Sequence, residues 1–143
     1  MGEIRKHTPE DIDALMNVWE TASVQAHSFL KADFVVLVRE EMRVRYLPNS
    51  ETWVYEDNGD IVGFISMVNN EIAGLFILPS AQRKGIGMQL ADHVVKLHNE
   101  LEVEVFEKNE IGRDFYNKYG FQLMFTYHHK QSDETVLRLK FSK

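Results

Sequence analysis

The spacing of hydrophobic residues changes along the chain, from a helical period near the N-terminus to the alternating period of strands beyond Thr52. A short strand is predicted over residues 3–7. Residues 8–11 (Thr-Pro-Glu-Asp) then have the order of a helix start, with a capping residue, a proline at the first helical position and acids in the first turn. A second helical pattern runs from about Asp33 and is expected to end before Pro48.

Alternation in the second part predicts a run of antiparallel strands followed by a strand–helix–strand unit. The hairpin signal Asp57-Asn58-Gly59 and a tight turn at Asn69-Asn70 separate the first three of these strands. Strands are expected at residues 53–55, 61–68, 71–78, 101–106, 121–129 and 135–141, with helices from Gly87 to about residue 99 and at residues 110–119. The helix between the strands ending at residue 78 and starting at residue 101 implies a parallel pairing. The pattern therefore predicts an α/β chain with a mixed sheet.

The segment Gln82-Arg83-Lys84-Gly85-Ile86-Gly87 lies between a predicted strand and a predicted helix. Glycines let the backbone approach a ligand closely, and the free N–H groups of a helix start favour an anion such as a phosphate. Glycine spacing alone is also typical of an ordinary strand-to-helix turn. A dinucleotide-binding domain is disfavoured, because Leu90 stands where the third glycine of its fingerprint would be and antiparallel hairpins precede the loop.

The same segment resembles the Q/R-x-x-G-x-G/A motif of the GNAT superfamily of N-acetyltransferases. A second resemblance consists of Asn109, Phe115-Tyr116 and Tyr119-Gly120-Phe121. The resemblance implies a mixed, mostly antiparallel sheet of six or seven strands with helices on both faces, opened where acetyl-CoA inserts between the fourth and fifth strands. It implies that Asn109 contacts CoA and that Tyr116 lies near the thioester sulfur. The residues that it assigns to acetyl-CoA binding are Leu75, Phe76, Ile77, Gln82, Arg83, Lys84, Gly85, Ile86, Gly87, Met88 and Asn109.

Length and composition narrow the possible partners. The chain has 143 residues, which fits a single domain spanning residues 1–143, and it has no cysteine, so disulfides and a cysteine nucleophile are excluded. A net charge of −6 disfavours nucleic acid and suits a cationic amine. With no leader and no long apolar run, we expect a cytoplasmic protein without a membrane partner. Family members are often monomers or homodimers.

Acetyl transfer to an amine needs a group that accepts a proton from the amine and an acid for the departing thiolate. Tyr116 is the candidate acid. It could instead be an aromatic residue of the core, because Phe115 and Tyr119 lie beside it at helical spacing. Glu71 and Glu104 are the candidate bases, with Glu71 predicted to deprotonate the ammonium, and both could instead be solvent-facing strand residues. In a regular strand Glu71 would share a face with Leu75 and Ile77, and partial burial there would raise its pKa. Without a cysteine, direct attack of the amine in a ternary complex is the economical mechanism.

An alternative function, the nature of the acceptor and the roles of the histidines have still to be considered. A non-catalytic acyl-CoA-binding or regulatory module could share the fold. The sequence does not distinguish a small-molecule amine from a protein amine as the acceptor.

His27 is expected to be a structural or surface residue, in a region that lines the acceptor pocket in the family that the chain resembles. No metal site is expected at His128-His129, because adjacent strand residues point to opposite faces.

Overall fold

The computed structural model describes residues 2–143 and has one seven-stranded sheet in the order β1-β2-β3-β4-β5-β7-β6. The strands are β1 (Gly2–Lys6), β2 (Glu51–Asp57), β3 (Asp60–Val68), β4 (Glu71–Ile77), β5 (Glu100–Phe106), β6 (Gln122–His129) and β7 (Glu134–Ser142). The helices are α1 (Ile12–Ala26), α2 (Ala32–Glu41), α3 (Leu47–Asn49), α4 (Ile86–His98) and α5 (Glu110–Tyr119). Every strand pairing is antiparallel except that of β4 with β5, so the predicted mixed sheet is confirmed.

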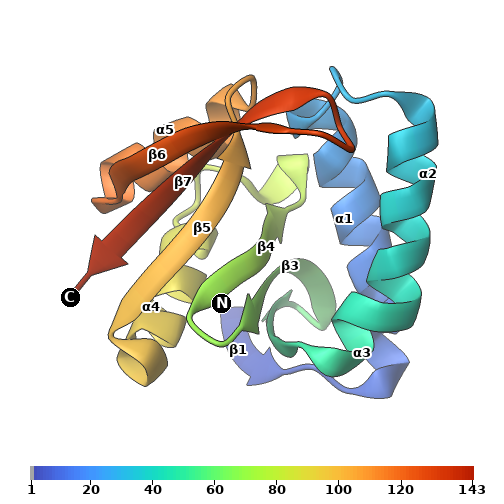
Figure 1. Ribbon diagram of the computed structural model, residues 1–143. Coiled ribbons are helices and arrows are strands. Elements are labelled where there is room, and N and C mark those ends of the chain that lie inside the picture. The colour runs from blue at the N-terminus through green and yellow to red at the C-terminus, as the bar shows by residue number, and fades with distance from the viewer. Residues whose placement is uncertain (1) are drawn as a thin grey trace.

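Helices cover both faces of the sheet (Figure 1). Phe64 and Ile65 are neighbours on β3 and both are fully buried, which requires apolar partners on each side of the strand. Phe64 packs with Leu15 and Val18 of α1, while Ile65 belongs to a cluster that contains residues of α4. Each fully buried side chain of this size contributes about 1.5–3 kcal/mol to folding. The sequence therefore needs a helix layer on both faces, as expected.

The second helical region extends further than the sequence predicted. After α2 the chain continues through a π-helical turn (Met42–Tyr46) into α3, so the helical turns run to Asn49 and not to the residue before Pro48. Proline lacks an N–H group, but it is tolerated in the first turn of a helix. Pro48 lies at such a position in α3, and the wider π turn comes directly before it. The predicted helix end was therefore wrong.

The sheet opens between β4 and β5. These two strands are paired only at their starts, where Glu71 lies opposite Glu102 and Ile72 lies opposite Val103. Beyond this point β5 continues to pair with β7 up to Phe106, while β4 stays with β3 up to Ile77. Figure 1 shows the two strands diverging. The backbone of β4 from Ala73 onward therefore has no strand partner on its β5 side.

No helix among residues 2–143 has the length and apolar character that crossing a membrane requires.

Candidate active site

A cavity of about 230 Å³ lies where β4 and β5 part. Leu75 and Phe76 of β4 and Glu104 of β5 line it, and so do residues of three helices. The helical lining residues include Trp19, Ser23 and His27 near or in α1, Phe34, Val35 and Val38 of α2, and Gly112 and Tyr116 of α5. The cavity is thus bounded by helices from both faces of the sheet. The expectation that the region around α1 and α2 lines a pocket is confirmed.

Tyr116 is buried at the α5 side of this cavity, with 6% of its surface exposed. Its ring contacts Phe115 and Phe121, with centroids 5.2 and 5.1 Å apart. Burial raises the pKa of the Tyr116 hydroxyl well above its usual value, so the group is protonated at neutral pH. Within residues 2–143 the hydroxyl makes no hydrogen bond. It is therefore a proton donor that remains available to a ligand in the cavity.

A β-bulge in β4 changes the position expected for Glu71. Ser66 of β3 lies opposite Gly74, but the next residue, Met67, lies opposite Ile72, so Ala73 is the extra residue. Beyond the bulge the alternation of faces is shifted by one residue. Glu71 consequently shares a face with Phe76 and not with Leu75. The predicted placement of Glu71 on the face of Leu75 and Ile77 was wrong, and so was the apolar environment inferred from it.

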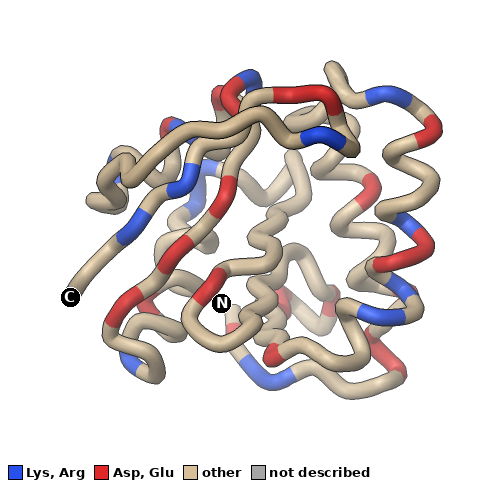
Figure 2. Tube along the Cα trace, viewed as in Figure 1, with Lys and Arg blue, Asp and Glu red and all other residues tan. Residues whose placement is uncertain are grey.

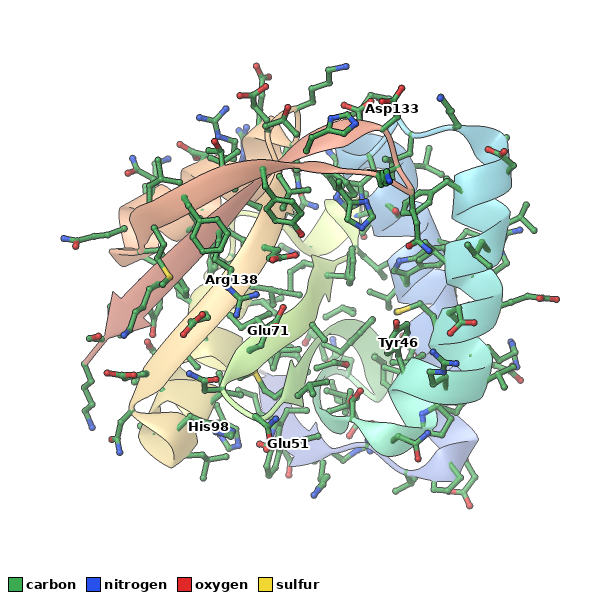
Figure 3. The ribbon with its side chains drawn as sticks, in the orientation of Figure 1. Tyr46, Glu51, Glu71, His98, Asp133 and Arg138 are labelled. Carbon is green, nitrogen blue, oxygen red and sulfur yellow. The ribbon has the colours of Figure 1, made fainter. Side chains whose placement is uncertain are left out.

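Glu71 and Glu104 are instead connected through Arg138 of β7. The guanidinium lies 3.1 Å from Glu71, 3.2 Å from Glu104 and 2.7 Å from Glu102. Figure 3 shows Arg138 and Glu71 pointing toward each other between the strands, and Figure 2 shows the acids of β5 beside basic residues of β7. Arg138 thus joins β4, β5 and β7 next to the opening. Both candidate bases lie on one face, but only Glu104 lines the cavity.

Tyr127 of β6 adds a second contact to Glu104. Its hydroxyl donates to Glu104 Oε1 at 2.6 Å, while Arg138 contacts Glu104 Oε2. Burial and the neighbouring Glu104 carboxylate raise the pKa of Tyr127 to about 12. Neither Tyr127 nor Arg138 was predicted from the sequence as a site residue. Their distance along the chain from Glu104 leaves no local pattern that could have pointed to them.

Asn109 connects the start of α5 with the end of α1. Its Oδ1 accepts from Gly112 N at 2.9 Å, which assigns Nδ2 as the atom 3.2 Å from His27 Nε2. Because Nδ2 can only donate, His27 Nε2 is the acceptor, and the proton of the neutral ring is on Nδ1, 3.1 Å from Ser23 Oγ. Burial lowers the pKa of His27 to about 4, which keeps the ring neutral. The structural interpretation of His27 is supported, although it also borders the cavity.

Of the two glycines in the loop, Gly85 has a left-handed backbone that other residues avoid, whereas Gly87 lies within α4 and has no positive φ. Gly85 has a φ of +79° and nothing within 4 Å of the position of a Cβ, and Arg83 also has a positive φ of +66°. Gln89 N donates to Gly85 O, so the amides of residues 86–88 precede the first helical hydrogen bond of α4. Gln82 Nε2 donates to Ile77 O at 3.1 Å and thereby ties the loop to the end of β4. The loop is therefore suited to binding an anion through its backbone.

The side chains of the loop have different surroundings. Arg83 and Lys84 are exposed, and Met88 is 51% exposed, so all three can reach a ligand outside the fold. Ile86 is buried, so it could contact a cofactor only through its backbone. A Cβ on Gly87 would lie 3.0 Å from the ring of Phe115. A side chain at Gly87 would therefore press on Phe115 between α4 and α5, independently of any ligand.

Among residues 2–143 no group of three or more His, Asp or Glu side chains could hold a metal ion. His128 pairs with Asp133, and His129 is 2.7 Å from the hydroxyl of Ser132.

The strands β4 and β5 part beside one cavity, and a glycine loop follows β4 and opens α4. Residues 48–123 match the model of the acetyltransferase (GNAT) domain family. The chain therefore belongs to the GNAT family. The expected activity, acetyl transfer from acetyl-CoA to an amine, is confirmed.

Two similar proteins are named as peptidyl-lysine N-acetyltransferases. The chain is 32% identical over 126 residues to the peptidyl-lysine N-acetyltransferase YiaC of Escherichia coli K12, a match that covers 85% of this chain and 84% of YiaC. It is 31% identical over 121 residues to the peptidyl-lysine N-acetyltransferase YjaB of the same organism, covering 84% and 82% of the two chains.

Solved structures agree with the fold. The solution structure of apo YjaB from Escherichia coli superposes with a TM-score of 0.88 at 26% identity, over 99% of this chain and 97% of that one. A PaiA N-acetyltransferase from Thermoplasma acidophilum, solved with coenzyme A, has a TM-score of 0.77 at 22% identity over 99% of both chains.

Proposed function

We propose that the protein acetylates the ε-amine of lysine side chains in peptides or proteins, by direct attack of the amine on acetyl-CoA. The observation that carries this proposal is the cavity between β4 and β5, which borders Tyr116 on the α5 side and an apolar wall with Glu104 on the α1 and α2 side. One opening thus offers a proton donor for a thiolate and a carboxylate for an ammonium group.

Acetyl-CoA is proposed to bind along β4 and the start of α4. The backbone of β4 beyond Ile72 has no strand partner on its β5 side, so its N–H and C=O groups can bind the amides of the pantetheine arm as an added strand would. The amides of residues 86–88 and the positive φ of Gly85 fit the pyrophosphate. Arg83 and Lys84 would add positive charge near the phosphates.

The acceptor is proposed to enter from the α2 side. Phe34, Val35 and Val38 of α2, with Met42 after it, form an apolar wall of the cavity. A lysine side chain has an apolar four-carbon stem and a charged end, and such side chains bury the stem against apolar surface. Glu104 would meet the charged end. The names of YiaC and YjaB, both peptidyl-lysine N-acetyltransferases, support this acceptor class.

In this proposal Glu104 accepts the first proton of the ammonium group and passes it to solvent, which leaves a free amine. Glu71 is the alternative base, on the same face and contacting the same guanidinium. As the carbon–nitrogen bond forms and the carbon–sulfur bond breaks, Tyr116 donates its proton to sulfur. The second proton lost by nitrogen then restores the Tyr116 hydroxyl. General acid and base steps of this kind each contribute about 10²–10⁴-fold to a rate.

The test is acetylation of a synthetic peptide that has one internal lysine and a blocked N-terminus, followed by mass spectrometry and by release of free CoA. We expect modification of the lysine peptide and none of a matched arginine peptide. Peptides with ornithine or diaminobutyrate in place of lysine should react progressively more slowly, because a shorter stem does not bring the amine as far into the cavity. Faster reaction with small polyamines than with the lysine peptide would contradict the proposed acceptor. Acetyl-CoA binding without CoA release from any amine would instead indicate the non-catalytic module.

A further inference from the structure

We propose that Tyr127 is a positioning residue for catalysis, which holds the carboxylate of Glu104 toward the cavity together with Arg138. This inference rests on the proposed function, because it assigns Glu104 as the group that accepts the proton of the lysine ammonium.

The two oxygens of Glu104 are held by different groups. Oε1 accepts the hydroxyl proton of Tyr127 at 2.6 Å, and Oε2 lies 3.2 Å from Arg138 Nη1. Tyr127 is on β6 and Arg138 on β7, and the register places Arg138 directly opposite Glu104. Contacts from two strands therefore restrict the rotation of one side chain. A hydrogen bond of this length from a hydroxyl to a carboxylate is charge-assisted and stronger than one between neutral groups.

Glu71 has no comparable support. Its contact in this network is with Arg138 Nη1 at 3.1 Å, the same atom that contacts Glu104. It lies at the start of β4, before the bulge, and it does not line the cavity, whereas Glu104 does. An oriented carboxylate at the cavity is better placed to accept a proton than one outside it, because proton transfer requires hydrogen-bond reach. These contacts and its place at the cavity make Glu104 the better candidate for the proton acceptor.

Tyr127 can serve as a donor throughout the usual assay range. Burial and the Glu104 carboxylate raise the pKa of Tyr127 to about 12, so its hydroxyl remains protonated. The ring lies 6.2 Å from that of Phe125 and 6.5 Å from that of His129, both on β6. Loss of the hydroxyl alone would leave these ring contacts in place. Tyr127→Phe therefore removes the hydrogen bond to Glu104 with little other change.

The experiment is a double-mutant cycle in kcat with the lysine peptide, using wild type, Tyr127→Phe, Glu104→Gln and the double variant. Tyr127→Phe should lower kcat roughly 10-fold, a fraction of the about 10²–10⁴-fold supplied by a general base. The KM for acetyl-CoA should not change. In the Glu104→Gln background the same substitution should have no further effect, because Tyr127 acts through Glu104.

Tyr119→Phe is the matched control, since its hydroxyl also donates to a carboxylate, that of Asp92 at 2.7 Å, between α5 and α4. This control should keep the wild-type kcat. Equal losses from Tyr127→Phe in both backgrounds, or no loss in either, would overturn the inference. A fully active Glu104→Gln would overturn it too, while lysine acetylation by the wild type still stood. A wild type that acetylates no amine would refute the proposed function and this inference together.

Discussion

Gly85 and Gly59 share a left-handed backbone, with φ of +79° and +84°, and neither has an atom within 4 Å of the position that a Cβ would take. Gly59 lies in the turn between β2 and β3, whereas Gly85 directly precedes α4. A valine would be equally strained at either position. Comparing a valine at Gly85 with a valine at Gly59 therefore distinguishes the effect of backbone strain from the loss of a ligand contact.

We expect Gly85→Val to abolish acetyl-CoA binding, because strain and a branched side chain would move the amides that the pyrophosphate requires. Gly59→Val should lose a similar amount of stability and keep its affinity for acetyl-CoA. Calorimetric titration with acetyl-CoA and thermal unfolding of both variants provide the comparison. Wild-type affinity in folded Gly85→Val would show that the loop does not hold the pyrophosphate. Gly87 is a poorer test position, since its Cβ would press on Phe115.

Tyr116→Phe should lower kcat by roughly 10²-fold or more, as expected for loss of a general acid. The ring contacts with Phe115 and Phe121 would remain, so stability and acetyl-CoA affinity should change little. Single-turnover measurements of the acetylated lysine peptide would report the chemical step directly. An unchanged rate of that step would remove Tyr116 from the mechanism.

The two carboxylates next to Arg138 can be separated by their pH profiles. Glu104→Gln should lose activity at neutral pH and recover part of it at high pH, where a free lysine, with a pKa of about 10.4, is increasingly unprotonated without help. Glu71→Gln removes a neighbour of Arg138 outside the cavity and should keep the shape of the wild-type profile. Profiles of kcat/KM for the lysine peptide distinguish the two. The reverse result, with high-pH recovery only in Glu71→Gln, would assign the base to β4.

The contrast between Glu71 and the glycine loop shows which parts of the site could be read from the sequence. The loop is local: its glycines, the preceding strand and the following helix are adjacent in the chain, and all appear in the structure as expected. The bulge at Ala73 has no comparable local signal, because it depends on how β4 pairs with β3. One inserted residue was enough to reverse the predicted face of Glu71.

Contacts over long sequence separations were equally inaccessible. Asn109 and His27 are 82 residues apart, and Arg138 is 34 residues from Glu104. Glu104 could be named as a candidate from its place in an apolar strand, but nothing along that strand specified which cation would meet it. Seven strands, their turns and the parallel crossover could be predicted because each follows from spacing along a short segment. Side-chain partners depend on the order of strands in the sheet, which spacing alone does not specify.

The start of α1 provides a prediction for stability against pH. Asp11 accepts hydrogen bonds from Arg5 at 2.8 and 3.0 Å and from Thr8 N at 2.7 Å. The hydrogen bonds from Arg5 outweigh the effect of burial and lower the pKa of Asp11 from 3.8 to about 2. Because the folded pKa lies below the unfolded one, this contribution to stability is fully present above about pH 4 and is lost as pH falls through about 2.

We therefore expect Asp11→Asn to lower the free energy of unfolding at pH 7 by on the order of 1–2 kcal/mol, since one pKa unit corresponds to about 1.4 kcal/mol and Arg5 is partly exposed to solvent. Urea unfolding of wild type and variant at a series of pH values would show this difference shrinking between about pH 4 and pH 2, where the wild-type carboxylate becomes protonated. Asp13→Asn is the control on the same helix: Asp13 pairs with Arg43 at 2.8 Å, but its side chain is 88% exposed, so its loss should change stability little at any pH. A difference between wild type and Asp11→Asn that stayed constant down to pH 2 would mean that the Asp11 charge does not carry the stabilisation and that its hydrogen-bonding geometry alone does.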